Sequence, residues 1–67
     1  MMAEIEIYNR VRVVTPRFES QGVRPGMEGY VIDVYPDGNF EVEVSDSRTG
    51  ETIALFAAGP SDLERDE

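Results

Sequence analysis

The tripeptide Pro36-Asp37-Gly38 separates two short apolar runs and is the strongest turn signal in the chain. The flanking runs, 30–35 and 40–44, have the length and composition of β-strands and predict an antiparallel hairpin. A three-residue loop with Gly38 in the left-handed region sets the register. That register pairs Val34 with Phe40, Ile32 with Val42, Tyr30 with Val44, Asp33 with Glu41 and Val31 with Glu43. We expect the first three pairs to face the core and the last two to face solvent.

Further strands are predicted on both sides of this hairpin. Residues 4–13 alternate with period two, which is typical of a half-buried strand. Its inward set is Ile5, Ile7, Val11 and Val13. Thr15-Pro16 ends it, and the polar residues 17–26 predict a long loop. After a turn at 45–51, Thr52 to Phe56 forms the fourth expected strand.

The C-terminal residues predict a short helical turn. Pro60 to Leu63 reads as that turn, with Leu63 returning to the core, and we expect residues 64–67 to be a frayed acidic tail. The element order ends in a short strand, and residues 1–67 make a single domain. The expected fold class is mainly β, an SH3-like, partly open antiparallel barrel of about five short strands with one helical turn.

Lys, His, Cys and Trp are all absent, which removes several classes of function. There is no disulfide or thiol nucleophile, no histidine base and no Schiff-base lysine. The segment 46–51 resembles a calcium loop only faintly, because its spacing is wrong and Arg48 would place a positive charge in the site. We therefore expect no enzyme activity, no catalytic residue, no metal site and no cofactor.

Neither a signal peptide nor a membrane span is visible in the sequence. The N-terminus has no basic region, and no apolar run approaches the roughly 20 residues of a span. We expect a cytoplasmic protein.

The net charge of −8 lies entirely in the second half of the chain. Residues 1–32 hold four acids and four arginines, whereas residues 33–67 hold ten acids and two arginines. An acidic surface repels phosphate backbones and favours a basic partner, or else only keeps the protein soluble.

The motif Gly26-Met27-Glu28-Gly29-Tyr30-Val31 resembles the Gly-x-x-Gly-x-Val signature of many SH3-like barrels, including the KOW type of ribosomal and transcription factors. From Tyr8 to Glu64 the chain resembles a family of small bacterial proteins known as domain of unknown function 4926. The resemblance implies a short, acidic, standalone protein, in some cases encoded beside a toxin-like partner. It implies no activity and supplies no catalytic residue.

We expect the function to be protein binding through the outer face of the central hairpin. The candidate residues are Asp33, Tyr35, Asp37, Glu41 and Glu43, with Val31 on the same face. This mixture of carboxylates and apolar groups suits a basic protein partner, most concretely a toxin masked by an antitoxin or immunity-type protein. Phe18 and Val23, apolar residues in a polar loop, are either a second contact surface or core residues.

Three alternatives remain open. The first is an accessory or structural barrel of a larger enzyme complex. The second is an RNA-contacting barrel that uses four arginines and exposed aromatic side chains, which the net charge disfavours. Its residues would be Arg10, Arg12, Arg17, Arg24, Tyr8, Phe18 and Tyr35. The third is a homo-oligomer formed through an exposed edge strand.

Overall fold

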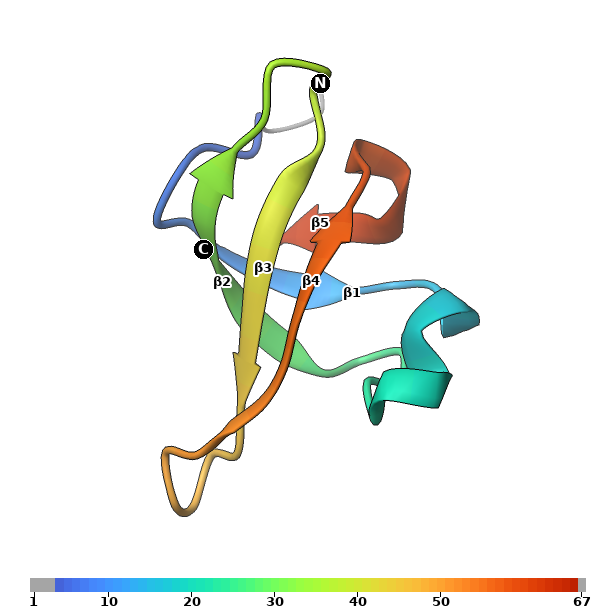
Figure 1. The fold of residues 1–67 in the computed structure, drawn as a ribbon, viewed down its shortest axis with the longest axis vertical. Coiled ribbons are helices and arrows are strands. Elements are labelled where there is room, and N and C mark those ends of the chain that lie inside the picture. Colours follow the sequence, from blue (N-terminus) through green and yellow to red (C-terminus); the bar gives the residue numbers. More distant parts are fainter. Residues whose placement is uncertain (1–3, 67) are drawn as a thin grey trace.

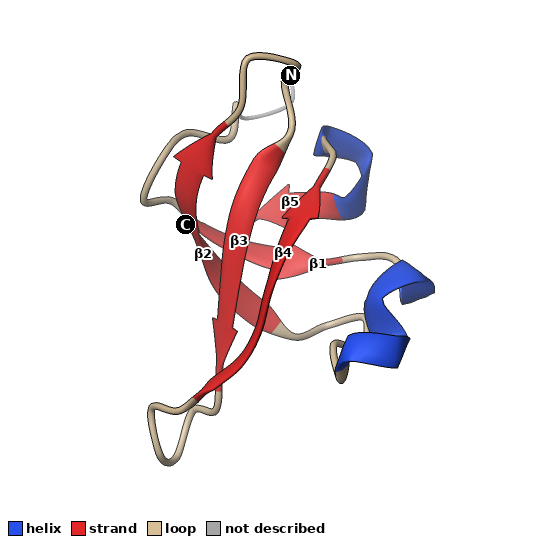
Figure 2. Ribbon diagram, in the orientation of Figure 1, coloured by secondary structure: helices blue, strands red, loops and turns tan. Residues whose placement is uncertain are grey.

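The computed structural model describes residues 4–66 and shows one antiparallel sheet of five strands (Figure 1). The strands are β1 (Arg10–Val13), β2 (Glu28–Val34), β3 (Phe40–Ser45), β4 (Thr52–Ala58) and β5 (Leu63–Arg65). They lie in the order β4-β3-β2-β1-β5, and two 3-10 helices, η1 (Pro16–Gln21) and η2 (Pro60–Asp62), connect them (Figure 2). The mainly β, five-stranded expectation is confirmed. The bent sheet is open between β4 and β5, and it is compatible with an SH3-like barrel.

The core lies on the concave side of this sheet. Its members are Val11, Val13, Phe18, Val23, Val31, Phe40, Val42, Val44, Ala54, Phe56, Ala58 and Leu63. Phe18 of η1 packs on Phe56 of β4, with 4.4 Å between ring centroids. The predicted loop 17–26 therefore contains a 3-10 helix, and it contributes core residues from between β1 and β2.

The central hairpin has the predicted three-residue loop. Gly38 has a φ of +90°, and its N–H donates to the carbonyl of Tyr35. The backbone N–H of Tyr35 in turn donates to the carbonyl oxygen of Asn39 at 2.8 Å. Val34 lies opposite Phe40, as the loop length requires.

Beyond Asp33 the predicted register is wrong because β2 contains a bulge. Val31 pairs with Val42 and Tyr30 with Glu43, which leaves Ile32 as the extra residue. The insertion exchanges the two faces of the strand, so that Val31 is buried while Tyr30 and Ile32 are exposed. Val34 does stay opposite Phe40, but it is half exposed rather than buried.

The N-terminal strand is shorter than predicted because a turn interrupts residues 4–13. Tyr8 has a φ of +70°, and Asn9 closes the turn by donating to the Glu6 carbonyl and accepting from the Glu6 N–H. The regular strand begins only at Arg10. Ile7 is consequently exposed, whereas Ile5 still packs against the core.

Residues 64–66 are not a frayed tail. Leu63 is buried as predicted, and the chain then continues as β5 beside β1, with Val13 opposite Leu63 and Arg12 opposite Glu64. The N–H of Asp66 donates to the carbonyl of Arg10. Glu67 lies outside the described residues.

Candidate functional site

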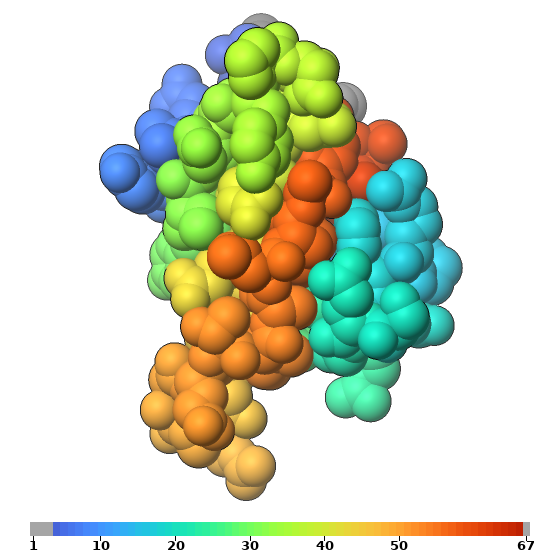
Figure 3. Space-filling view, in the orientation of Figure 1, coloured from blue at the N-terminus to red at the C-terminus, as the bar shows by residue number. Residues whose placement is uncertain are grey.

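The convex side of β2, β3 and β4 carries a mixed surface that we call the acidic face. Its members are Tyr30, Ile32, Asp33, Tyr35, Glu41, Glu43, Leu55 and Ala57. Glu43 lies between Tyr30 and Leu55 in one cross-strand row, and Glu41 lies between Asp33 and Ala57 in the next. Figure 3 shows the three strands side by side on the front of the molecule.

Alternation along β3 creates this face. Phe40, Val42 and Val44 point into the core, so the two intervening glutamates point outward. The bulge then turns apolar side chains of β2 to the same side. Tyr30 is 54% exposed and Ile32 37%, while Leu55 of β4 is 52% exposed. One row therefore places Glu43 between two large apolar side chains, and the next row places two carboxylates, Asp33 and Glu41, side by side.

Neutral donors, not arginines, contact the two glutamates. The Tyr35 hydroxyl donates to Glu41 Oε1 at 2.5 Å, and the Thr52 hydroxyl donates to Glu43 Oε2 at 2.7 Å. Within residues 4–66, none of the ion pairs includes Asp33, Glu41 or Glu43. The negative charge of the acidic face is thus uncompensated in this part of the chain.

Tyr35 stays neutral as a hydrogen-bond donor on this face. The bond to Glu41 raises the pKa of the phenol above its ordinary value of 10.0, and desolvation adds to the shift. The charges of Glu41, Asp33 and Asp37 act in the same direction. The Tyr35 hydroxyl therefore keeps the proton that it donates to Glu41.

Asp37, the candidate at the hairpin tip, shapes the loop itself. Its Oδ1 accepts the N–H of Asn39 at 2.9 Å, which is a local turn contact. Asp37 remains exposed and adds charge at the end of the hairpin.

The structure brings together four of the five predicted candidates, and the fifth, Asp37, lies at the hairpin tip. It also corrects the positions of Val31, Phe18 and Val23. Asp33, Tyr35, Glu41 and Glu43 lie on adjoining positions of β2 and β3 and at the start of the loop. Val31 is not on this face, because it is fully buried in the core. Phe18 and Val23 are core residues as well, so they cannot form the second contact surface. The sequence reasoning missed Tyr30, Ile32 and Leu55, whose exposure follows from the bulge and from the alternation along β4.

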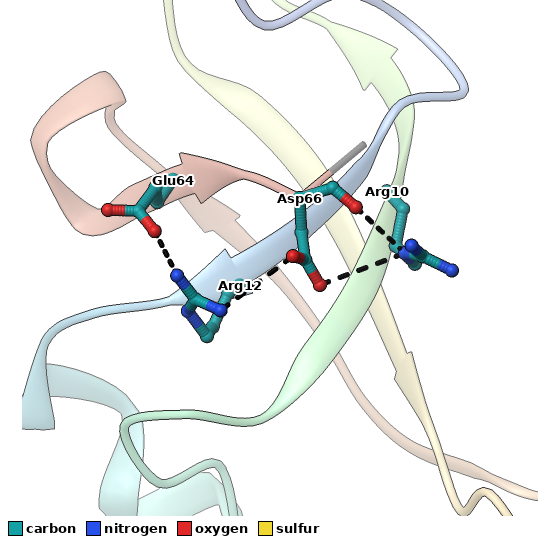
Figure 4. A network of polar contacts seen from close by, with 4 residues as sticks. All are labelled: Arg10, Arg12, Glu64 and Asp66. Atoms are coloured by element: carbon teal, nitrogen blue, oxygen red, sulfur yellow. Dashed lines mark hydrogen bonds and ion pairs between the residues drawn. The ribbon is translucent and has the colours of Figure 1, made fainter.

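The N-terminal arginines meet acids from the other end of the chain. Arg10 and Arg12 form an ion-paired network with Glu64 and Asp66 (Figure 4). A fifth member of this cluster is Glu28, which lies opposite Arg12 on β2. A hydrogen bond to Asp66 and the charge of Asp66 raise the pKa of Glu28 above its ordinary value of 4.5, while Arg10 and Arg12 oppose the shift.

This network leaves little basic surface for RNA. Arg17 also pairs with the buried Asp62, at 3.6 Å, so three of the four arginines considered for RNA contact have acidic partners within the chain. Their partners are C-terminal acids on or next to β5 and η2.

A half-open groove of about 840 Å³ lies between the tip of the β2–β3 hairpin, η2 and β5. Its apolar lining comes from Ile5, Val14, Val34, Phe40 and Leu63. At its rim, Arg65 donates to the Glu4 carbonyl and Glu64 pairs with Arg12. The groove therefore offers mainly apolar contact.

The segment 46–51 forms a self-contained turn. Asp46 Oδ1 accepts the N–H groups of Arg48 and Thr49, and Gly50 takes a φ of +79°. Among residues 4–66 no cluster of three acidic side chains is arranged to hold a metal ion. The same residues include no helix that is long and apolar enough to cross a membrane.

Comparison with known proteins identifies the family. The chain belongs to the family described as Domain of unknown function (DUF4926), whose model matches residues 7–65. No curated protein and no solved structure matches the sequence.

Proposed function

We propose that this member of a family of unknown function is a non-catalytic binding module that docks a basic region of another protein on its acidic face. The observation that carries the proposal is the order of side chains across β2, β3 and β4 on that face. Asp33, Glu41 and Glu43 lie beside exposed Tyr30 and Leu55, with no ion pair to any described arginine. Unpaired carboxylates next to large apolar groups are what a basic, partly apolar surface complements.

The charge distribution supports this choice of face. Arg10, Arg12 and Arg17 pair with acids near the C-terminus, and the flanking segments 1–32 and 52–67 carry net charges of only 0 and −3. Residues 33–51 hold six acids and one arginine, a net charge of −5 over the central hairpin and the following turn. Most of the net charge therefore lies in the segment that carries Asp33, Glu41 and Glu43, and this charge would steer a basic partner and make association sensitive to salt.

The apolar side chains supply the other half of such an interface. Tyrosine is among the residues that most often dominate binding energy, and Leu55 and Ile32 extend its contact area. The acidic face is an exposed, convex surface, which suits docking of a partner more than enclosure of a small substrate.

The most specific form of the proposal is an antitoxin or immunity-type protein that masks a small basic toxin. The carboxylates would cover the toxin's cationic site, and the apolar groups would slow dissociation. An accessory barrel within a larger complex is the alternative. It would need no unpaired charge at this position.

The test compares two charge-matched double variants on the partner that co-purifies with the protein. E41Q/E43Q removes two charges from the acidic face, and E6Q/E19Q removes two exposed charges elsewhere. We expect E41Q/E43Q to raise the Kd at least about tenfold, and E6Q/E19Q to raise it only about twofold. Added salt should weaken the wild-type complex. Equal affinity of both variants, with no salt dependence, would show that the acidic face only aids solubility.

A further inference from the structure

The two edges of the sheet differ in how they are protected. The edge strand β5 is three residues long, includes Glu64 and Arg65, and is tied down by ion pairs. The other edge strand, β4, runs for seven residues with the sequence TIALFAA, which contains no charge and no proline. Charges, prolines and short length are the usual means of protecting an edge, and β4 has none of them.

Hydrogen bonding along β3 shows which groups of β4 are free. The carbonyl of Asn39 accepts from Tyr35 on the β2 side, so alternation directs Phe40, Val42 and Val44 toward β4. Their partners are Ala58, Phe56 and Ala54. The backbone groups of Leu55 and Ala57 therefore point away from the sheet. Within residues 4–66, β4 pairs with β3 alone.

The backbone groups on the unpaired side of β4 belong to Leu55 and Ala57. η1 approaches β4 through side chains, with Phe18 packed on the ring of Phe56 and Gly22 beside Ile53. Figure 1 shows β4 as the end strand on this side of the sheet, with the coil of η1 next to it. Leu55 and Ala57 are exposed, and a further strand could hydrogen-bond to both.

The charges beside this edge specify the occupant. Ala57 lies directly opposite Glu41, and Leu55 directly opposite Glu43. An added strand would place its outward side chains two strand spacings from β3, roughly 10 Å. Arginine and glutamate side chains can together span that distance, and the small Ala57 leaves the path to Glu41 open. A second copy of the chain would instead present the uncharged β4 and bring another net charge of −8.

We propose that an extended segment of the basic partner adds to the free edge of β4 as a sixth strand. Its arginine or lysine residues would occupy alternate positions, facing Glu41 and Glu43, while its backbone bonds to Leu55 and Ala57. This inference rests on the proposed function, because it assigns the binding mode of the same acidic face.

The test uses amide hydrogen exchange read by NMR on the full-length protein. In the free protein, the amides of Leu55 and Ala57 should exchange much faster than those of Ala54, Phe56 and Ala58. The probe is a synthetic peptide of alternating arginine and valine, and its control has glutamate in place of every arginine. We expect the arginine peptide to slow exchange at Leu55 and Ala57 at least about tenfold and the control to leave it unchanged.

Variants separate this inference from the proposed function. A57P removes an N–H that faces the free edge, and A58G, at a position bonded to β3, serves as a control for general weakening of the strand. We expect A57P, with the wild-type circular dichroism spectrum, to lose peptide binding about tenfold, and A58G to retain it. If A57P does not fold, the exchange rates of the wild-type protein decide the question alone.

The remaining outcomes each count against a defined claim. Peptide binding that E41Q/E43Q weakens, without protection of Leu55 and Ala57, overturns strand addition and leaves the proposed function standing. Binding of both peptides with equal affinity overturns the proposed function as well. Protection that rises with protein concentration in the absence of peptide identifies a second copy as the occupant and overturns the basic segment.

Discussion

Asp33 and Glu41 face each other directly across the β2–β3 pair, two carboxylates on one exposed surface. Like charges in this arrangement oppose folding. A sequence optimised only for stability would avoid the pair, so its presence agrees with a surface kept for binding.

The first prediction follows from this opposition. Asp33→Asn removes the repulsion, and its amide oxygen can still accept from the N–H of Val34, as Asp33 Oδ1 does now. We expect the free energy of unfolding to rise by about 0.5 kcal/mol. We expect the same variant to bind the partner more weakly. Urea denaturation and titration calorimetry measure the two effects, and a variant that is both less stable and equally tight in binding contradicts the interpretation.

The second prediction concerns the bulge in β2. Val31→Ala removes part of a fully buried side chain and should lower the free energy of unfolding by about 2 kcal/mol. Ile32→Ala, the neighbouring change on the exposed side, should cost well under about 1 kcal/mol while weakening partner binding. Without the bulge, Ile32 would be buried and Val31 exposed, so Ile32→Ala would be the more destabilising change. Chemical denaturation of the two variants therefore decides between the two registers.

The third prediction concerns the second glycine of the Gly-x-x-Gly motif. A Cβ added at Gly29 would lie 2.5 Å from the carbonyl oxygen of Glu43, a backbone atom that cannot move without shifting β3. We expect Gly29→Ala to cost more than about 3 kcal/mol. Gly50→Ala is the control, because Gly50 has a φ of +79° but open space around it, and it should cost about 1 kcal/mol. Similar losses in the two variants would refute the close approach.

Local chemistry made the hairpin predictable, whereas the bulge had no signal in the sequence. Pro36 fixes its own φ and Gly38 permits the left-handed conformation that the loop needs, so the loop length and the pairing of Val34 with Phe40 could be derived. The bulge at Ile32 depends on how β2 meets β1 and β3 together. The period-two pattern correctly predicted that Glu41 and Glu43 point away from the core, but it placed Val31 and Tyr30 on the wrong faces.

A short final strand was predicted, but the assignment of residues 64–66 to a frayed tail was wrong for a related reason. Their neighbours in the sequence indicate only that Glu64 and Asp66 are solvated charges. Their partners, Arg10 and Arg12, are more than 50 residues away in the sequence and become adjacent only when β5 lies beside β1.

The fourth prediction tests this strand. Removal of residues 64–67 should lower the free energy of unfolding by at least about 2 kcal/mol, because the pairing of Glu64 and Arg65 with β1 is lost and Leu63 becomes the chain end. The double variant E64Q/D66N keeps the backbone pairing and removes only the charges. We expect it to cost about 1 kcal/mol or less, since the ion pairs are largely exposed. Equal stability of the truncated and full-length proteins would instead support the interpretation that these residues are a frayed tail.

The last prediction uses the raised pKa of Glu28. The hydrogen bond to Asp66 exists when Glu28 carries the proton, so it stabilises the fold below the ordinary pKa of 4.5. That contribution is lost as the pH rises through the raised pKa of the folded protein, where the ionised Glu28 faces Asp66. Glu28→Gln donates the same bond at every pH. Its melting temperature should therefore exceed that of the wild type at neutral pH and converge with it in acid, whereas Glu19→Gln, an exposed change away from this cluster, should follow the wild type throughout. A Glu28→Gln variant that is more stable than the wild type only in acid would contradict the raised pKa of Glu28 and exclude its hydrogen bond to Asp66.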